Sequence, residues 1–206
     1  MVARRRGWGG DPPETDDEAR RRIIEAATEL LTQRSCALLL SDVADSLNVA
    51  RQTVYKYFPS ADALVTAAAL VLVDEVIDTV ARRTDPSDGP GTAVVDAVVA
   101  AVEIVNDSAV LRHAFRHSEH LHLATGVVSR MTRGQVVITL RQTGIDWTGL
   151  GYSPGDLDDI ADLALRMLQS QLLSPDDSGD PGELRAKLLR WIRPAIDAGV
   201  TQASTD

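Results

Sequence analysis

The chain has 206 residues, 44% of them hydrophobic and 25% charged, a composition that suits one large soluble domain or two smaller ones. Its net charge of −9 is divided unevenly, because residues 1–60 carry nine basic and nine acidic side chains whereas residues 61–206 carry 12 basic and 21 acidic ones. The single cysteine, Cys36, excludes an intramolecular disulfide, and apolar runs such as residues 67–73 are far shorter than the roughly 20 residues of a membrane span. We therefore expect a cytoplasmic protein whose acidic C-terminal body repels polyanions.

The N-terminal residues 1–14 are rich in Arg, Gly and Pro, and we expect a disordered tail. No apolar segment follows Arg4, Arg5 and Arg6, so the tail is not a signal peptide. The three arginines either remain solvated or enter a DNA minor groove, as basic arms of other proteins do.

The first helix is predicted to begin at residues 15–18, Thr-Asp-Asp-Glu, a capping box that places acidic side chains at the positive end of the helix. It is expected to end near Arg34. Its apolar face has helical spacing and consists of Ile23, Ile24, Ala27, Leu30 and Leu31.

Residues 41–58 have the pattern of two short helices joined by a tight turn. Ser41 is the expected N-cap of the first of them. Asn48 follows that helix and tolerates the left-handed conformation that a helix C-terminus needs, although less readily than glycine. The buried faces of the two helices are predicted to contain Val43, Ala44, Leu47, Val54 and Phe58.

The outer face of the second short helix is basic. Residues 48–58 contain two basic side chains and no acidic one, in a protein of net charge −9. Basic side chains bind phosphates favourably, because binding releases condensed counterions. Arg, Gln and Thr can hydrogen-bond base edges in a major groove, and tyrosine hydroxyls can hold phosphates. The pattern predicts a DNA-recognition helix. The expected DNA contacts are Ser41, Arg51, Gln52, Thr53, Tyr55, Lys56 and Tyr57.

Residues 53–60, Thr-Val-Tyr-Lys-Tyr-Phe-Pro-Ser, followed by Leu64, resemble the signature of TetR-family transcriptional regulators. The resemblance extends over about residues 18–72. The chain departs from the family pattern at three places: Asn48 replaces the usual glycine of the turn, Ala50 a common capping Ser or Thr, and Ala61 a frequent lysine that contacts phosphate.

The rest of the chain reads as helical, and the fold class is all-α with about nine helices. The segments are a helix over 60–83, a loop over 85–91, helices over 92–105, 109–117 and 121–142, a loop over 143–154 packed by its tryptophan, and helices over 155–173 and 181–198. We expect a DNA-binding domain over 15–60 and a ligand-binding and dimerisation body over 61–206, in which 61–83 is the linking helix.

The last two helices carry more apolar surface than a pair of helices can bury between them. Resemblance to the family implies a homodimer joined through these helices, so that two recognition helices read the half-sites of a palindrome about 34 Å apart. The expected interface residues are Leu157, Ile160, Ala164, Met167, Leu168, Leu188, Trp191, Ile192 and Ile196.

A ligand-responsive repressor is the leading hypothesis, released from its operator by a small, mostly hydrophobic effector that binds the body. The expected effector-binding residues are Val98, Val102, Leu111, Phe115, His117, Val127, Met131 and Trp147. A DNA-binding protein without a ligand is a further hypothesis. We expect no enzyme and no cofactor, since the chain has no glycine-rich phosphate loop, nucleophile elbow or His-Glu-x-x-His pair.

The four histidines all lie within residues 113–122, and His113, His117 and His120 would form one stripe on a continuous helix. A metal sensor or metal-dependent enzyme is therefore the alternative function. The competing interpretation is a solvated histidine cluster, which would change its charge near pH 6.5.

Overall fold

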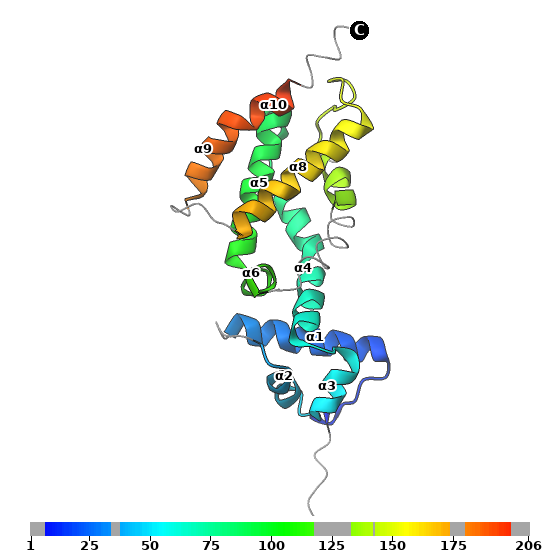
Figure 1. The fold of residues 1–206 in the computed structure, drawn as a ribbon. Helices are drawn as coiled ribbons and strands as arrows, with labels where there is room; N and C mark the ends of the chain where they lie inside the picture. The colour runs from blue at the N-terminus through cyan, green and yellow to red at the C-terminus, as the bar shows by residue number, and fades with distance from the viewer. Residues whose placement is uncertain (1–6, 34–37, 118–132, 142, 174–179, 199–206) are drawn as a thin grey trace, which may run out of the picture. The chain divides into compact units, whose positions relative to one another are not determined.

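The structure is a computed structural model that describes residues 7–33, 38–117, 133–141, 143–173 and 180–198. Within these ranges all regular secondary structure is helical, which confirms the predicted all-α class (Figure 1). None of the described helices is long and apolar enough to cross a membrane. The chain divides into two compact units, the first made of residues 1–73 and 108–118 and the second of residues 74–107 and 119–206.

The first unit contains α1 (Asp16–Gln33), α2 (Leu40–Ser46), α3 (Arg51–Tyr57) and the beginning of α4 (Ala61–Arg83). It also contains α6 (Ala109–His117), which packs against α1. This grouping differs from the predicted division at residue 60, because one apolar core joins side chains from all five helices. Its members include Ile23, Ala27, Leu31, Val43, Val54, Phe58, Leu64, Ala68 and Val110, all buried.

Two helices of the first unit have a side-chain cap, at the predicted Thr15 and at Ser60. The Thr15 hydroxyl accepts a hydrogen bond from the Glu18 amide at 3.1 Å, and the Ser60 hydroxyl accepts one from the Ala63 amide at 3.1 Å. The predicted cap at Ser41 is wrong. Helix α2 begins at Leu40 after an extended Leu39 that makes no side-chain capping bond. This earlier start lets both Leu38 and Leu40 be buried in the core, and Ser41 lies half-buried in the first turn.

The turn between α2 and α3 has the conformation expected of it. Asn48 is left-handed, with φ of 55°, and the Val49 amide donates to the Ala44 carbonyl at 2.9 Å to close the end of α2. Val49 is half-buried against the core of the first unit. An asparagine can therefore serve at a position where the family usually has glycine.

Replacing Asn48 by alanine is expected to lower the free energy of unfolding by about 1 kcal/mol, because the short polar side chain of asparagine offsets the cost of a left-handed backbone through local hydrogen bonds, whereas alanine keeps the Cβ clash with the following carbonyl oxygen and has no polar group. Asn48→Gly keeps this conformation without a Cβ and is expected to stay closer to the wild type. Denaturant titration of the three proteins measures the difference. An alanine variant as stable as the wild type would contradict the assignment of strain to this residue.

The prediction of a disordered tail as far as residue 14 is wrong for residues 7–14. Trp8–Gly10 form a short 3-10 helix, η1. The Trp8 amide donates to the Leu47 carbonyl at 3.0 Å, and the indole packs against the core of the first unit. The composition of this segment is that of a loop, but one tryptophan provides enough apolar surface to hold it in place.

The second unit is built around α5 (Pro90–Asp107), which packs against α8 (Pro154–Leu173), α9 (Pro181–Trp191) and α10 (Arg193–Asp197). Helix α5 is largely buried, including residues 91–95 and 98–101. The loop before it contains a 3-10 turn, η2 (Pro86–Asp88). Residues 133–141 are helical, which agrees with the predicted helix over 121–142 where the structure describes it.

Trp147 packs the loop over 143–154 as predicted. It is buried, its indole N–H donates to the Leu140 carbonyl at 2.6 Å, and its ring meets that of Tyr152 edge-on at 5.2 Å. The Tyr152 hydroxyl donates to the Ile196 carbonyl at 2.8 Å, and burial raises the pKa of this phenol. The loop therefore belongs to the core of the second unit.

The single helix predicted over 181–198 is wrong in one respect. The helix is interrupted at Ile192, although the backbone of this residue stays in the right-handed helical region, so that α9 ends at Trp191 and α10 begins at Arg193. Pro194 explains the break, because proline has no amide hydrogen and its ring clashes with the carbonyl four residues earlier.

Candidate nucleic-acid interface

Helix α3 has one buried and one exposed face. Val54 and Phe58 are buried in the core of the first unit. On the opposite side Arg51, Gln52, Tyr55 and Lys56 are exposed, and the Tyr55 side chain is 54% accessible. Two predicted contacts, Thr53 and Tyr57, are half-buried. The core thus fixes the helix and leaves a basic, hydrogen-bonding surface in solvent.

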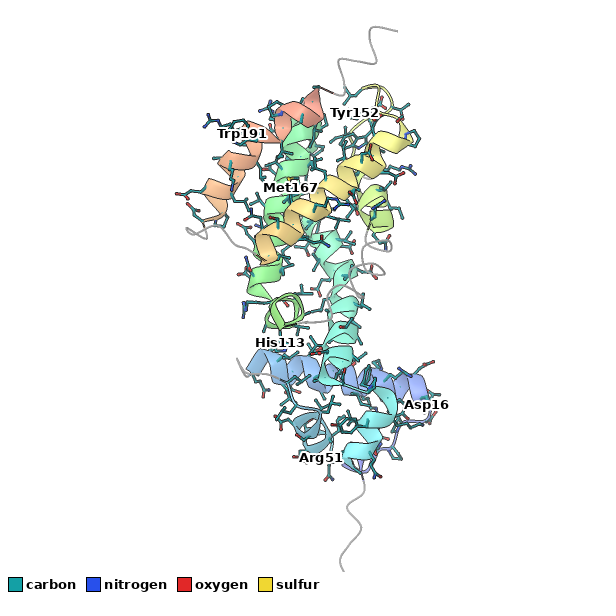
Figure 2. All side chains as sticks on the ribbon, viewed as in Figure 1. Asp16, Arg51, His113, Tyr152, Met167 and Trp191 are labelled. Carbon is teal, nitrogen blue, oxygen red and sulfur yellow. The ribbon has the colours of Figure 1, made fainter. Side chains whose placement is uncertain are left out.

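The end of α3 is tied to the beginning of α1 through Asp16 (Figure 2). One carboxylate oxygen of Asp16 accepts hydrogen bonds from the Tyr57 hydroxyl at 2.7 Å and from the Lys56 ammonium at 3.0 Å. The Lys56 ammonium also donates to the Tyr57 hydroxyl at 3.2 Å. Arg20 lies over the rings of Tyr57 and Phe58, with its guanidinium carbon 5.8 Å from each centroid.

The contacts among Asp16, Lys56 and Tyr57 shift the pKa values of Asp16 and Lys56. The hydrogen bond from Tyr57 is the main reason that the pKa of Asp16 is lowered, and the contacts with Lys56 add to it. The hydrogen bond to Asp16 in turn raises the pKa of Lys56. At neutral pH the carboxylate is therefore ionised and Lys56 is charged. A phosphate that binds Lys56 must compete with Asp16 for this cation.

The sequence pattern did not indicate this role for Asp16. The residue reads locally as an acidic side chain in the first turn of a helix, and its partners lie 40 and 41 residues later in the chain. Only the fold of the first unit, which brings the start of α1 beside the end of α3, places the three groups together.

The structure places the predicted effector-binding residues in different cores. Val98 and Val102 pack with Leu184 and Leu188, whereas Trp147 belongs to a second cluster with Leu157. Leu111 is buried on α6, which belongs to the first unit. The side chains of Phe115 and His117, and residues Val127 and Met131, lie outside the described part of the chain.

The predicted histidine stripe falls mostly outside the described residues as well. His113 is half-buried on α6, whereas the side chain of His117 and all of His120 are not described. Within the described ranges no three His, Cys, Asp or Glu side chains are grouped so that they could hold a metal ion. The metal hypothesis therefore gains no support from this part of the chain.

The predicted dimer residues divide into three groups by their exposure. Four of them, Leu157, Ile160, Leu188 and Ile196, are buried within the second unit of a single chain. By contrast Trp191, at the end of α9, leaves 67% of its surface exposed. The remaining four are half-buried: Ala164, Met167, Leu168 and Ile192.

Taken together, the turn at Asn48, the buried face of α3 and its exposed basic face define a helix-turn-helix unit. Residues 23–68 match the family described as bacterial regulatory proteins, tetR family. The match agrees with the resemblance of residues 53–60 to this family and extends it over residues 23–68.

Two curated relatives each match a part of the chain. The HTH-type transcriptional regulator AlkX of Mycobacterium tuberculosis is 37% identical over 68 residues, 32% of this chain and 32% of that protein. The HTH-type transcriptional repressor LfrR of Mycolicibacterium smegmatis is 34% identical over 83 residues, 40% of this chain and 43% of that protein. The matches thus span less than half the length of these relatives.

The whole fold is also found among solved structures. The TetR-family repressor AlkX of Dietzia sp., implicated in biodegradation of n-alkanes, superimposes with a TM-score of 0.64 at 21% identity, covering 92% of this chain and 100% of that one. This likeness extends beyond the helix-turn-helix and shows that the second unit shares the fold as well.

Proposed function

We propose that the protein is a DNA-binding transcriptional regulator, and specifically a repressor, whose α3 helix enters the major groove of its operator. The exposed face of α3 carries this proposal: Arg51, Gln52 and Lys56 are all accessible on a helix fixed by the core. Arginine and glutamine hydrogen-bond base edges, and lysine neutralises phosphates. The curated relatives are transcriptional regulators, one of them a repressor, which supports a regulatory rather than a catalytic role.

We further propose that the protein acts as a homodimer on a palindromic site and is released by a small, mostly hydrophobic effector bound in the second unit. An exposed tryptophan such as Trp191 is costly in a monomer and typical of an interface. The effector must bind better to the form that releases DNA, since equal affinity for both forms would shift nothing.

Binding to a DNA fragment from upstream of the protein's own gene, at two salt concentrations, tests the proposal. We expect tight binding that weakens steeply as salt rises, because phosphate contacts release counterions. If that fragment does not bind, selection from a random DNA library gives the site without assuming its position. Failure to select any sequence would refute the proposal.

The contacts of Asp16 lead to a separate prediction. Asp16→Asn is expected to tighten operator binding by about 2- to 5-fold at low salt, because it removes a negative charge beside Lys56 and keeps an oxygen that accepts the Tyr57 hydroxyl. The gain should shrink as salt rises.

Asp17→Asn is the matched control, since Asp17 is exposed and also lies in the first turn of α1. Fluorescence anisotropy with labelled operator measures all three proteins. If the affinity for the operator rises equally in the two variants, the overall charge causes the effect and not the contact with Lys56. Weaker binding by Asp16→Asn would mean that the carboxylate serves to hold Tyr57 and Lys56 in position.

A further inference from the structure

Three consecutive arginines of α1, Arg20, Arg21 and Arg22, have different surroundings although they are neighbours in the chain. Arg22 is half-buried. Its guanidinium donates to the Asp11 carbonyl at 2.6 Å, to the Asp11 carboxylate at 2.9 Å and to the Glu18 carboxylate at 2.5 Å. These bonds hold the segment before α1 against the helix, so Arg22 serves the fold of the first unit.

Arg21 is exposed, but it is also paired with acidic side chains. Its guanidinium lies 2.6 Å from the Glu25 carboxylate, one helical turn later, and 4.0 Å from the Glu18 carboxylate. Ion pairs between residues one turn apart are common on the solvent face of a helix and contribute little to stability. Arg21 therefore has the surroundings of an ordinary solvated side chain.

Arg20 is exposed as well, but its guanidinium makes no ion pair and no hydrogen bond within the described residues. Its guanidinium carbon lies 5.8 Å from the ring centroids of Tyr57, the last residue of α3, and of Phe58, the residue after it. A cation within about 6 Å of an aromatic ring is attracted to the electrons of its face. The two rings thus hold Arg20 beside the end of α3 and leave its N–H donors available.

The nearby carboxylate of Asp16 does not pair with Arg20. Asp16 precedes Arg20 by one helical turn, at the start of α1, and one of its oxygens accepts from the Lys56 ammonium and from the Tyr57 hydroxyl (Figure 2). Arg20 lowers the pKa of Asp16 less than Tyr57 or Lys56 does. Two cations from different helices and one carboxylate leave a net positive charge where the start of α1 lies beside the end of α3.

We propose that Arg20 binds a phosphate of the operator, so that the DNA interface extends from α3 to the start of α1. The inference rests on the proposed function of α3 and adds a contact on a second helix. When the N-terminal residues of a recognition helix reach base edges, its C-terminal end lies nearer the sugar-phosphate backbone. A guanidinium there can donate two parallel hydrogen bonds to one phosphate. Because the aromatic rings already orient Arg20, less side-chain entropy is lost when DNA binds.

A contact with a phosphate has a different signature from a contact with a base. The phosphate carries no sequence information, so Arg20 should strengthen binding to the operator and to unrelated DNA alike. Each phosphate contact also adds about 0.9 to the slope of log affinity against log salt concentration. A dimer with two copies of Arg20 on two half-sites would gain about 1.8 in this slope.

The first test is Arg20→Gln in the full-length protein, with Arg21→Gln as the matched control, because both remove one positive charge from neighbouring exposed positions of α1. Arg20→Gln is expected to weaken operator binding by about 10- to 50-fold, to lower the salt slope by about 1.8 and to leave the base preference unchanged. Arg21→Gln should weaken binding by less than about 3-fold, because solvent and salt screen its charge. The basic tail, residues 4–6, lies outside the described part of the chain and is kept in every variant.

The second test locates the contact on the DNA. In a set of operators, one phosphate at a time is replaced by an uncharged methylphosphonate. The wild type should lose affinity at the phosphate that Arg20 binds, whereas Arg20→Gln should lose nothing further there. Arg20→Lys keeps the charge without the planar fork and should restore the salt slope but only part of the affinity. The melting temperatures of these variants should stay close to that of the wild type, since Arg20 is exposed.

The outcomes separate the two proposals. If the wild type binds its operator and Arg20→Gln binds with the same affinity and salt slope, the inference fails while the function of α3 stands. Equal losses in Arg20→Gln and Arg21→Gln would also refute it, because general charge would explain both. A changed base preference in Arg20→Gln would place the arginine on a base and contradict the phosphate contact. If the wild type selects no DNA sequence at all, both proposals fail.

Discussion

Arg51→Ala is expected to lower the affinity of the dimer for its operator by about 1 to 3 kcal/mol per half-site, the value of one bidentate contact between an arginine and a guanine. Two half-sites would double the loss in free energy. Arg51 is the first residue of α3, its side chain is exposed, and it makes no ion pair with the described part of the chain. Its removal therefore leaves no buried group without a partner, and the stability of the protein should hardly change.

Two measurements make this prediction specific. Arg82→Ala removes the same charge from an exposed site in the second unit and should have little effect on affinity. Binding to operators with single base changes should show that Arg51→Ala relaxes the preference at one position per half-site. Affinity and base preference equal to those of the wild type would place the recognition surface on another element.

Local sequence patterns were sufficient to predict most of the helices. The buried face of α1, the start of α4 after Ser60 and the left-handed Asn48 all depend on residues within a few positions of one another. Such features follow from the helical period and from capping chemistry, which a single sequence displays directly. The same reasoning found the exposed face of α3.

Contacts between distant residues could not be predicted in this way. The bond from Trp8 to Leu47 spans 39 residues of chain and those of Asp16 to α3 span 40 and 41. Composition alone made residues 7–14 look disordered, and local spacing made Asp16 look like an ordinary acidic side chain in the first turn of a helix. In both cases tertiary packing decides the role, and the sequence has no local signal for it.

The second unit shows a further limit of predicting structure from sequence patterns. An apolar helical stripe predicts burial, but it does not say whether the chain's own core or a partner buries it. Leu157 and Leu188 pack inside the unit, whereas Trp191 from the same predicted set is exposed. We therefore restrict the proposed dimer interface to the surface around Trp191, the last residue of α9 (Figure 2).

Trp191→Ala is expected to weaken the dimer by about 2 kcal/mol or more, which corresponds to a roughly 30-fold higher dissociation constant. The indole leaves 67% of its surface exposed in one chain, and the Arg190 guanidinium lies 5.0 Å from its ring centroid. A partner chain would cover this surface, whereas in the isolated chain the exposed indole contributes little to the free energy of unfolding. The stability of the monomer should therefore stay within about 0.5 kcal/mol of the wild type.

Sedimentation equilibrium over a range of concentrations measures the dimer constant, and operator binding should weaken in parallel because a monomer reads only one half-site. Ile138→Ala is the matched control, since Ile138 is another exposed apolar side chain of the second unit but lies on neither α8 nor α9. It should leave the dimer unchanged. If Trp191→Ala also leaves the dimer constant unchanged, the two chains meet on another face, and the exposed indole must serve a different partner.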